Sequence, residues 1–415
     1  MEDRQEGSTG QGTAGVTEPA EVRVSQRSSK IRYAIRDILA LADEARAAGR
    51  QLLALNIGDP LAFDFCTPRH VIEATYRAML DGHNGYAPSA GLPEAIEAIR
   101  NEALGFGVQN IQDVFVTSGV SEGIDIAFAA LLDPGENILI PSPGYPLFES
   151  TLAKLGCEAI RYPLDEENDW QPDVAEMARL INSRTRGVVV INPNNPTGAV
   201  CRREILQDIA ELTARHGLVT FADEIYRKLI LDPVEHVPLA LLGPEQPMIT
   251  FNALSKAYLV PGFRIGWGIL TGEQRAVAAY REAIAKLLRV RLCANHPAQF
   301  AIKPALEGDQ SHIAEMIGKL RRRRDLTVSL LNEAGNIHCF SPQAAFYAFP
   351  RLEISGTDQE FVAGLIREAG VIVVPGTGFG QKPGTRHFRI VFLPPEDELG
   401  KALHRITEFA GRWPH

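Results

Sequence analysis

Residues 187–198 read GVVVINPNNPTG and join a continuous apolar run to a turn rich in proline and asparagine. An apolar run without polar alternation is typical of a strand that is buried on both faces of a parallel sheet. Proline and asparagine form turns on their own, so a plain strand-to-helix turn also explains the second half of this stretch. The six-residue PNNPTG pattern is nonetheless far more specific than a lone glycine pattern, and a rigid turn of this kind is able to present an amide side chain to a ligand.

The same apolar pattern recurs on both sides of this stretch. Apolar runs occur at residues 52–57, 114–116, 137–140, 218–222, 248–251 and 265–270, and amphipathic helical stretches lie between many of them. This alternation predicts an α/β fold with a mostly parallel central sheet flanked by helices. One long helical stretch is expected over residues 273–307. Beyond residue 310 a helix and several short strands with Gly/Pro turns predict a smaller α+β domain.

We therefore expect the chain to divide into four parts. Residues 1–27 are rich in Gly, Ser, Thr, Glu and Gln and nearly free of large apolar groups, which predicts a disordered tail. Residues 28–69 are expected to form an N-terminal segment that packs with the small domain. Residues 70–305 are expected to form the large domain, and residues 306–415 the small C-terminal domain.

The charge and cysteine content argue against several classes of protein. The chain has 42 basic and 51 acidic residues, a net charge of −9, so it lacks the basic footprint of a nucleic-acid-binding protein. The basic run at residues 321–324 lies in a helical pattern and is expected to be a solvated helix face. Five scattered cysteines without CxxC spacing argue against a disulfide framework and a metal site. No apolar stretch approaches the roughly 20 residues of a membrane span, and no apolar signal core is found, so we expect a cytoplasmic protein.

Polar residues follow the predicted strands at their carboxyl ends, which is where open parallel sheets bind ligands. After residues 114–116 the sequence reads TSGVSEG, and a turn of serine and glycine before a helix is typical of an anion site. A plain helix N-cap at Ser118 or Ser121 explains the same residues. This strand end alone therefore leaves both interpretations open.

Two further strand ends carry ionisable groups. Asp223 follows an apolar strand, where a carboxylate loses solvation unless it meets a cation, although an N-cap role is common at such a position. Tyr226 lies three residues on. Lys256 lies among small and apolar residues, which favours a nucleophilic amine, and Arg264 is able to bind an oxyanion. A surface position is the default for any one lysine. Together, however, the strand ends offer the groups that an aldehyde cofactor with a phosphate tail and a pyridinium nitrogen requires.

The order of PNNPTG at 193–198, ADEIY at 222–226, SK at 255–256 and GFR at 262–264 resembles the class I aminotransferases, which are pyridoxal phosphate (PLP) enzymes of fold type I. The resemblance runs from about residue 28 to the C-terminus. Two segments, LNIGDP at 55–60 and RLCANHPAQ at 291–299, are similar to the alanine (glutamate–pyruvate) aminotransferases of bacteria and archaea. Some relatives of this group are aspartate aminotransferases.

The resemblance implies a role for each residue around the cofactor ring. Lys256 would hold PLP as a Schiff base and, once displaced by the substrate, would move the substrate proton. Asp223 would pair with the pyridine nitrogen, and Asn195 and Tyr226 would bind the phenolic oxygen of the ring. Tyr145 would stack on the ring, although a core or turn position is its plain alternative.

The resemblance also implies how the phosphate is bound. The backbone of Ser118, Gly119 and Val120 would bind the phosphate together with Ser255 and Arg264. Val120 departs from the family pattern because it offers no hydroxyl group. Any contact with the phosphate at this position would therefore be through the backbone. Pro261, where relatives often have alanine or threonine, is a second departure, and it removes no required group.

The remaining implied roles concern the substrate and the neighbouring subunit. Tyr86 would reach the phosphate of the neighbouring subunit, which implies a homodimer with shared active sites. Arg389 and Asn195 would bind the substrate carboxylate, Gly58 would bring its backbone close to it, and Tyr33 would contact the substrate from the N-terminal helix. Without the resemblance, Arg389 is indistinguishable from a surface arginine, and Gly58 from a turn glycine.

These implications favour one reaction, the transfer of an amino group from L-alanine to 2-oxoglutarate by two ping-pong half-reactions. An aminotransferase with another donor, such as aspartate or a branched-chain or aromatic amino acid, is the nearest alternative. A different PLP reaction, such as that of a β-lyase or decarboxylase, and a non-enzymatic module of the same fold are the others.

Overall fold

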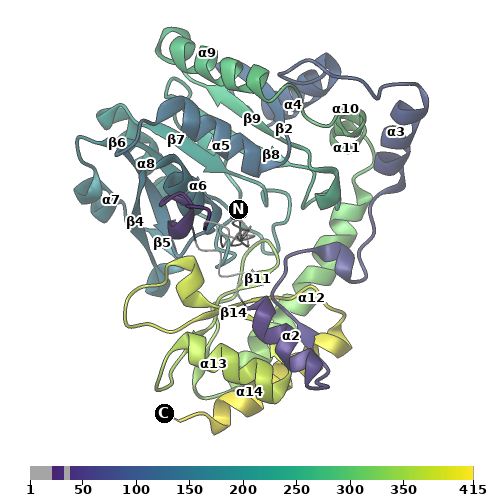
Figure 1. The fold of residues 1–415 in the computed structure, drawn as a ribbon, viewed down its shortest axis with the longest axis vertical. Coiled ribbons are helices and arrows are strands. Elements are labelled where there is room, and N and C mark those ends of the chain that lie inside the picture. The colour runs from purple at the N-terminus through teal and green to yellow at the C-terminus, as the bar shows by residue number, and fades with distance from the viewer. Residues whose placement is uncertain (1–20, 32–37, 415) are drawn as a thin grey trace, which may run out of the picture.

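The computed structural model describes residues 21–31 and 38–414, so most of the predicted tail lies outside the described residues. The middle of the chain forms one eight-stranded sheet (Figure 1). Its strand order is β2 (Ile111–Thr117), β9 (Gly266–Thr271), β8 (Met248–Ala253), β7 (Val219–Asp223), β6 (Thr185–Ile191), β3 (Asn137–Ser142), β4 (Glu158–Asp165) and β5 (Gln171–Pro172).

The sheet is mostly parallel, as the apolar runs predict. β9 runs antiparallel to both of its neighbours, and β5 runs antiparallel to β4. The pairing of Ala253 with Gly266 places the start of β9 beside the end of β8. Arg264 therefore lies at the same sheet edge as the residues that follow the parallel strands.

Helices cover both faces of this sheet. Alternate side chains of β6 enter two different cores, with Val188 and Val190 on one face and Val189 and Ile191 on the other. This two-sided burial explains why the strand is apolar throughout. One face carries α5 (Val120–Leu131), α6 (Leu147–Leu155) and α9 (Gln274–Val290), and the other carries α4 (Pro93–Gly105), α7 (Val174–Leu180) and α8 (Arg203–His216).

The long helical stretch expected over residues 273–307 is divided into three helices. α9 ends at Val290, and the short α10 (His296–Gln299) and α11 (Ile302–Glu307) follow it. Asn295 starts α10 by accepting a hydrogen bond from the backbone of Ala298, and a proline follows in the first turn. α10 packs on α3 (Arg69–Leu80), and α11 packs on α3 and α4.

The C-terminal part forms a smaller unit below the sheet in Figure 1. Its helices are α12 (Ser311–Glu333), α13 (Asp358–Gly364) and α14 (Glu396–Arg412), with a π-helical turn, η6 (Leu365–Ala369), after α13. Its short strands are β10 (Ile337–His338), β11 (Tyr347–Ala348), β12 (Arg351–Leu352), β13 (Val371–Ile372), β14 (Val374–Pro375) and β15 (Phe388–Val391).

The N-terminal segment packs on this smaller unit. α2 (Leu39–Ala47) contacts η6, and β1 (Leu53–Ala54) pairs in parallel with β13. The short 3-10 turns are η1 (Ser28–Lys30), η2 (Pro60–Ala62), η3 (Glu166–Asn168), η4 (Leu239–Leu241), η5 (Pro261–Phe263) and η7 (Gly376–Phe379). Among the described residues, no helix has the length and apolar character that crossing a membrane requires.

Only half of the basic run on α12 is the solvated face that its sequence suggested, because Arg321 and Arg322 are exposed whereas the next two arginines are buried. Arg323 is 1% exposed, donates hydrogen bonds to Asp64 and to the carbonyl oxygen of Leu393, and lies 5.2 Å from the ring centre of Phe65. Arg324 is also buried and pairs with an aspartate of the large unit. The sequence pattern indicates which residues belong to one helix. It does not indicate which of these residues become buried against other segments of the chain.

Candidate active site

The carboxyl ends of the parallel strands meet at a cavity of about 160 Å³. Eight of the residues predicted from the sequence line it: Val120, Tyr145, Asn195, Asp223, Tyr226, Ser255, Lys256 and Arg264. Seven further residues complete the lining: Ser121, Ile124, Leu147, Ile191, Ile225, Pro261 and Tyr347. Residues that lie more than 200 positions apart in the sequence thus share one small space.

Lys256 does not have the solvated surface position that is the default for a lysine. It follows β8 in a turn and is partly buried. Its amine donates a 3.0 Å hydrogen bond to the carbonyl oxygen of Gly58 and lies 5.5 Å from the ring centre of Phe346. The amine is therefore directed into the cavity and held by the N-terminal segment.

Asp223 is the last residue of β7 and is buried at the cavity wall. Burial raises the pKa of its carboxyl group to about 7, whereas a hydrogen bond of 3.2 Å from the backbone of Ile225 partly opposes the rise. The negative charge of Glu224 raises the pKa further, and Lys256 lowers it. A turn, not a helix, follows Asp223, so it caps no helix. A cation at this wall would stabilise the ionised carboxylate.

The side chains of the two neighbouring asparagines in the PNNPTG turn make different contacts. The side-chain oxygen of Asn194 accepts hydrogen bonds from the backbone and the hydroxyl group of Thr197, at 3.2 and 2.9 Å, and so stabilises the turn itself. Asn195 lines the cavity, and its side-chain oxygen accepts a 3.3 Å hydrogen bond from Arg389. The amide nitrogen of Asn195 is therefore the group left to donate into the cavity.

Arg389 is an interior residue, only 2% exposed. It lies on β15, and its guanidinium group lies 4.7 Å from the ring centre of Tyr347 and 4.8 Å from that of Phe379. It also donates a 2.5 Å hydrogen bond to the carbonyl oxygen of Asn56. Aromatic rings on the guanidinium and fixed carbonyl acceptors orient a planar fork that is suited to a carboxylate.

The anion-binding features expected after β2 adjoin the cavity. Gly119 precedes α5 with φ of 78°, and a Cβ atom there would collide with the Arg264 guanidinium group. α5 begins at Val120, so its N-terminus faces the cavity beside a cation. Ser118 lies outside the cavity lining, and its backbone amide donates a 2.7 Å hydrogen bond to Glu122.

Among the described residues, five predicted site residues are outside the cavity lining: Gly58, Tyr86, Ser118, Gly119 and Arg389. Tyr86 is 83% exposed. Two hydrogen bonds hold the backbone on either side of it. His296 donates to the carbonyl oxygen of Gly85, and the sulfur of Cys293 accepts from the backbone amide of Ala87. Segment 291–299 therefore positions the loop that carries Tyr86. Tyr33 lies outside the described residues.

Tyr347 is a cavity residue that the sequence did not reveal. Its hydroxyl group lies 2.9 Å from that of Tyr226, and its ring lies under Arg389. It belongs to the two-residue strand β11 within the segment AAFYAF. An aromatic residue in an apolar segment is usually a core residue, so no local signal distinguished it.

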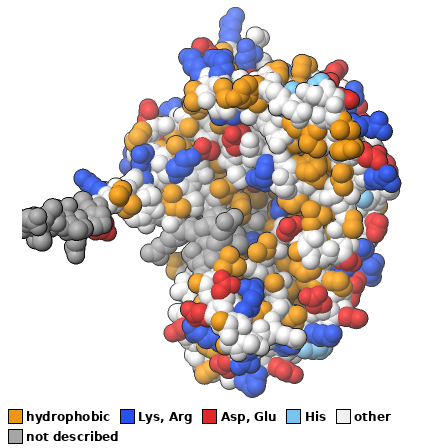
Figure 2. Space-filling model, turned by 45° about the vertical axis from the view of Figure 1, so that its right-hand side comes forward, with side chains coloured by type: hydrophobic (Ala, Val, Ile, Leu, Met, Phe, Trp, Pro, Cys, Tyr) orange, Lys and Arg blue, Asp and Glu red, His pale blue; other side chains and the backbone are white. Residues whose placement is uncertain are grey.

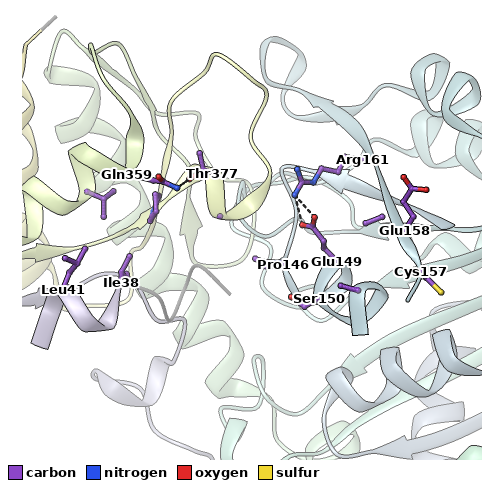
Figure 3. A pocket seen from close by; sticks show the side chains of 15 residues that line it. Ile38, Leu41, Pro146, Glu149, Ser150, Cys157, Glu158, Arg161, Gln359 and Thr377 are labelled. Carbon is purple, nitrogen blue, oxygen red and sulfur yellow. Dashed lines mark hydrogen bonds and ion pairs between the residues drawn. The ribbon is translucent and has the colours of Figure 1, made fainter. Parts of the chain in front are cut away.

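A larger cavity of about 740 Å³ lies apart from these groups, between α6 and β4 on one side and α2 and α13 on the other (Figure 3). Its polar lining includes Arg161, which forms two hydrogen bonds with Glu149, and Thr377, which accepts one from Gln359. These groups satisfy one another. The smaller cavity, which holds the lysine and the buried carboxyl group, is therefore the candidate active site.

Comparison with known proteins agrees with this choice. A model of the family "Aminotransferase class I and II" matches residues 50–406. The chain is 39% identical to the glutamate–pyruvate aminotransferase AlaA of Escherichia coli over 92% of this chain and 97% of that protein. It is 40% identical to the alanine aminotransferase of Mycobacterium tuberculosis over 88% of this chain and 86% of that protein. The structure of an alanine aminotransferase from Pyrococcus furiosus superimposes with a TM-score of 0.90 at 40% identity, and the match covers 94% of this chain and 99% of that one.

Proposed function

Because the chain belongs to the family of class I and II aminotransferases, it is a transaminase, and we propose that it transfers the amino group of L-alanine to 2-oxoglutarate. The products of this reaction are pyruvate and L-glutamate. The names of the relatives at 39–40% identity support the choice of substrates. The observation that supports it most directly is one cavity that combines a partly buried lysine, a buried aspartate with a raised pKa and a neighbouring buried arginine.

The residues present fit PLP, the cofactor of this family. A pyridinium nitrogen would supply the cation that the buried carboxyl group of Asp223 lacks. The N-terminus of α5 and the guanidinium group of Arg264 meet at Gly119 and suit a phosphate. Asn195 and Tyr226 both line the cavity and offer hydrogen-bond donors. We infer that these residues hold the cofactor, with Tyr145 against its ring.

Each residue then contributes a separate part of the reaction. When bound, PLP supplies an aldehyde that condenses with amino groups and a ring that delocalises the electron pair left when Cα loses its proton. We assign the proton transfer at Cα to the amine of Lys256, which acts first as a general base and then as a general acid. Asp223 keeps the ring nitrogen protonated. Tyr226 and Asn195 donate hydrogen bonds to the phenolic oxygen of the ring.

The substrate carboxylate is assigned to the buried Arg389. The fork of its guanidinium group is able to make a bidentate pair with a carboxylate, and every amino acid and 2-oxo acid substrate carries this group. Asn195 orients the arginine through its side-chain oxygen and donates to the carboxylate through its nitrogen. The missing side chain of Gly58 leaves room for the Tyr347 hydroxyl group, because a Cβ atom at Gly58 would collide with it.

We further propose that two copies of the chain share their active sites. Large apolar side chains are exposed on α3, on the loop after it, and at and after the end of α9: Tyr76, Met79, Leu80, Tyr86, Val290 and Leu292. Figure 2, which brings the side with α3 forward, shows several groups of hydrophobic side chains there. Apolar area of this kind is typical of an interface. A second copy seated on it would bring Tyr86 to a phosphate site. The cytoplasm remains the predicted location.

A donor panel tests the assignment. Purified holoenzyme is mixed with 2-oxoglutarate and with alanine, aspartate, leucine or phenylalanine, and the formation of glutamate is followed. We expect alanine to give the highest kcat/KM and to bleach the visible absorption band of the cofactor. Preference for another donor would overturn the choice of alanine. Loss of amino groups as ammonia, without consumption of 2-oxoglutarate, would overturn transamination.

The matched variants are Lys256→Ala and Lys286→Ala, which alter a cavity lysine and an exposed helix lysine. Lys256→Ala is expected to lose turnover by at least about 10³-fold, because proton transfer loses its base. It is also expected to lose the covalently bound cofactor, as read from the mass of the borohydride-treated protein. Lys286→Ala is expected to retain both. Turnover by Lys256→Ala would contradict the mechanism.

A further inference from the structure

The buried side chains of Tyr226 and Tyr347 meet through their hydroxyl groups. The two oxygens are 2.9 Å apart, and each residue is 3% exposed. Tyr226 follows β7 of the large sheet, whereas Tyr347 lies on β11 of the C-terminal unit. Their rings are perpendicular, with centres 5.7 Å apart. The hydrogen bond therefore joins two parts of the fold inside the candidate active site.

Three neighbours fix the position of the Tyr347 hydroxyl group. A Cβ atom on Gly58 would collide with its oxygen, so the backbone of the N-terminal segment lies directly against it. The guanidinium group of Arg389 lies over its ring, and Phe346 packs against the same ring with centres 4.7 Å apart. A hydroxyl group held in this way has little freedom to turn toward another partner.

We propose that Tyr347 is a positioning residue whose hydroxyl group donates to the oxygen of Tyr226 and so directs the proton of Tyr226 at the phenolic oxygen of the cofactor. This inference rests on the proposed function, in which Tyr226 binds that oxygen. A tyrosine hydroxyl group has one proton to donate. If Tyr226 gives its proton to the cofactor, its bond with Tyr347 must be one in which Tyr347 is the donor.

The surroundings favour the neutral form of Tyr226 in this chain of hydrogen bonds. Burial raises the pKa of Tyr226 well above its usual range, and the neighbouring Tyr347 raises it further. A neutral phenol that accepts one hydrogen bond becomes a stronger donor in the next, because the two bonds polarise each other. Tyr347 therefore strengthens the donation from Tyr226 to a negatively charged oxygen without touching that oxygen.

This arrangement has a spectroscopic consequence. Donation to the phenolic oxygen stabilises its negative charge and thereby lowers the pH at which the visible absorption band of the bound cofactor changes. Loss of one hydrogen bond of ordinary strength is expected to raise this midpoint by about half a unit to one unit. A purely structural role of Tyr347 in packing would leave the midpoint unchanged.

The experiment is a double-mutant cycle on holoenzyme, read by absorbance titration between about pH 5 and pH 10. Tyr347→Phe removes one oxygen and retains the ring under Arg389, Tyr226→Phe removes its partner, and the third protein carries both changes. Tyr258→Phe is the matched control, because Tyr258 is a buried tyrosine close in sequence to Lys256 but lies outside the cavity lining. Thermal unfolding of each protein checks that the fold is retained.

We expect Tyr347→Phe to raise the pH midpoint of the absorbance change, and Tyr226→Phe to raise it further. Introducing Tyr347→Phe into Tyr226→Phe should add nothing to the midpoint. Tyr258→Phe should match the parent protein. An unchanged midpoint in either single variant would overturn the proposal, as would an equal effect of Tyr347→Phe with and without Tyr226. These outcomes are distinct from failure of the proposed function, in which the parent protein itself would show no lysine-bound cofactor band or no transamination.

Discussion

The amine of Lys256 donates a 3.0 Å hydrogen bond to the carbonyl oxygen of Gly58, although 198 positions separate the two residues. Lys256 follows β8 of the central sheet, and Gly58 belongs to the N-terminal segment that packs on the C-terminal unit. The N-terminal segment thus holds the amine of a lysine that lines the cavity of the central sheet. The position of the lysine therefore depends on contacts that lie far from it in the sequence.

Substitution of Gly58 should disturb the site without unfolding the chain. The methyl group of Gly58→Ala would meet the hydroxyl oxygen of Tyr347, which itself contacts Tyr226. Overpacking of this kind is expected to lower kcat/KM about tenfold or more. The change Tyr347→Phe removes the closest obstacle, so the double variant should recover part of the loss. Steady-state kinetics with alanine check this, and full activity of Gly58→Ala would contradict the crowding argument. Gly400→Ala on α14, where no neighbouring atom lies within 4 Å, is the control.

The stability of the apoprotein should depend on pH through Asp223. Burial raises the pKa of this carboxyl group from 3.8 to about 7, so the folded state disfavours the ionised form. The folded protein then holds a proton that the unfolded chain releases. The free energy of unfolding of the apoprotein therefore falls by on the order of a few kcal/mol as the pH rises from about 4 to about 7.

This dependence is measured with Asp223→Asn, which has no proton to lose in that range. Thermal unfolding of both apoproteins at pH 5 and pH 8 should show the melting temperature of the parent falling relative to the variant as the pH rises. Bound cofactor should reverse the trend, because a pyridinium nitrogen pairs with the carboxylate. The control is Asp208→Asn, which changes an exposed aspartate on α8. If the melting temperatures of the parent and of Asp223→Asn differ by the same amount at pH 5 and pH 8, the carboxyl group does not titrate between these pH values.

Arg389 should govern the affinity for every carboxylate substrate. Lysine at this position keeps a positive charge but loses the planar fork and its contacts with two aromatic rings. Loss of a charged hydrogen bond is expected to raise KM for both alanine and 2-oxoglutarate by about 10- to 100-fold, with a smaller effect on kcat. Arg351→Lys, which changes a partly exposed arginine of the same unit, is the control. Unchanged KM values for Arg389→Lys would place the carboxylate elsewhere.

Tyr86 should act on the site of the partner subunit. Hybrid dimers of a Tyr86→Ala chain and a Lys256→Ala chain distinguish this from action within one chain. If Tyr86 serves the partner, the hybrid contains one site with both residues intact and therefore has about half the activity of the parent dimer. If Tyr86 serves its own chain, each site of the hybrid carries a defect. Activity and cofactor retention of purified hybrids are the readouts, and sedimentation of the parent protein checks that a dimer forms.

The central sheet and many of its site residues were predictable because their signals are local. A strand buried on both faces is apolar along its whole length, as in residues 187–191, and the turn after it carries its own proline and asparagine pattern. Asn195 and Lys256 follow such strands and Asp223 ends one, and parallel strands bring their carboxyl ends to one edge. The sequence alone therefore determined the α/β fold, the edge at which the site lies and the residues that sit directly on that edge.

Only the tertiary structure decided which distant groups complete the site. Tyr347 lies in an apolar segment like many core residues, and its hydroxyl group gains a partner only because β11 packs against the turn after β7. The burial of Arg323 on α12 and the raised pKa of Asp223 likewise depend on what covers these side chains. Local patterns record how a segment is shaped, whereas burial, electrostatics and contacts between segments depend on residues that are remote in sequence and adjacent only after folding.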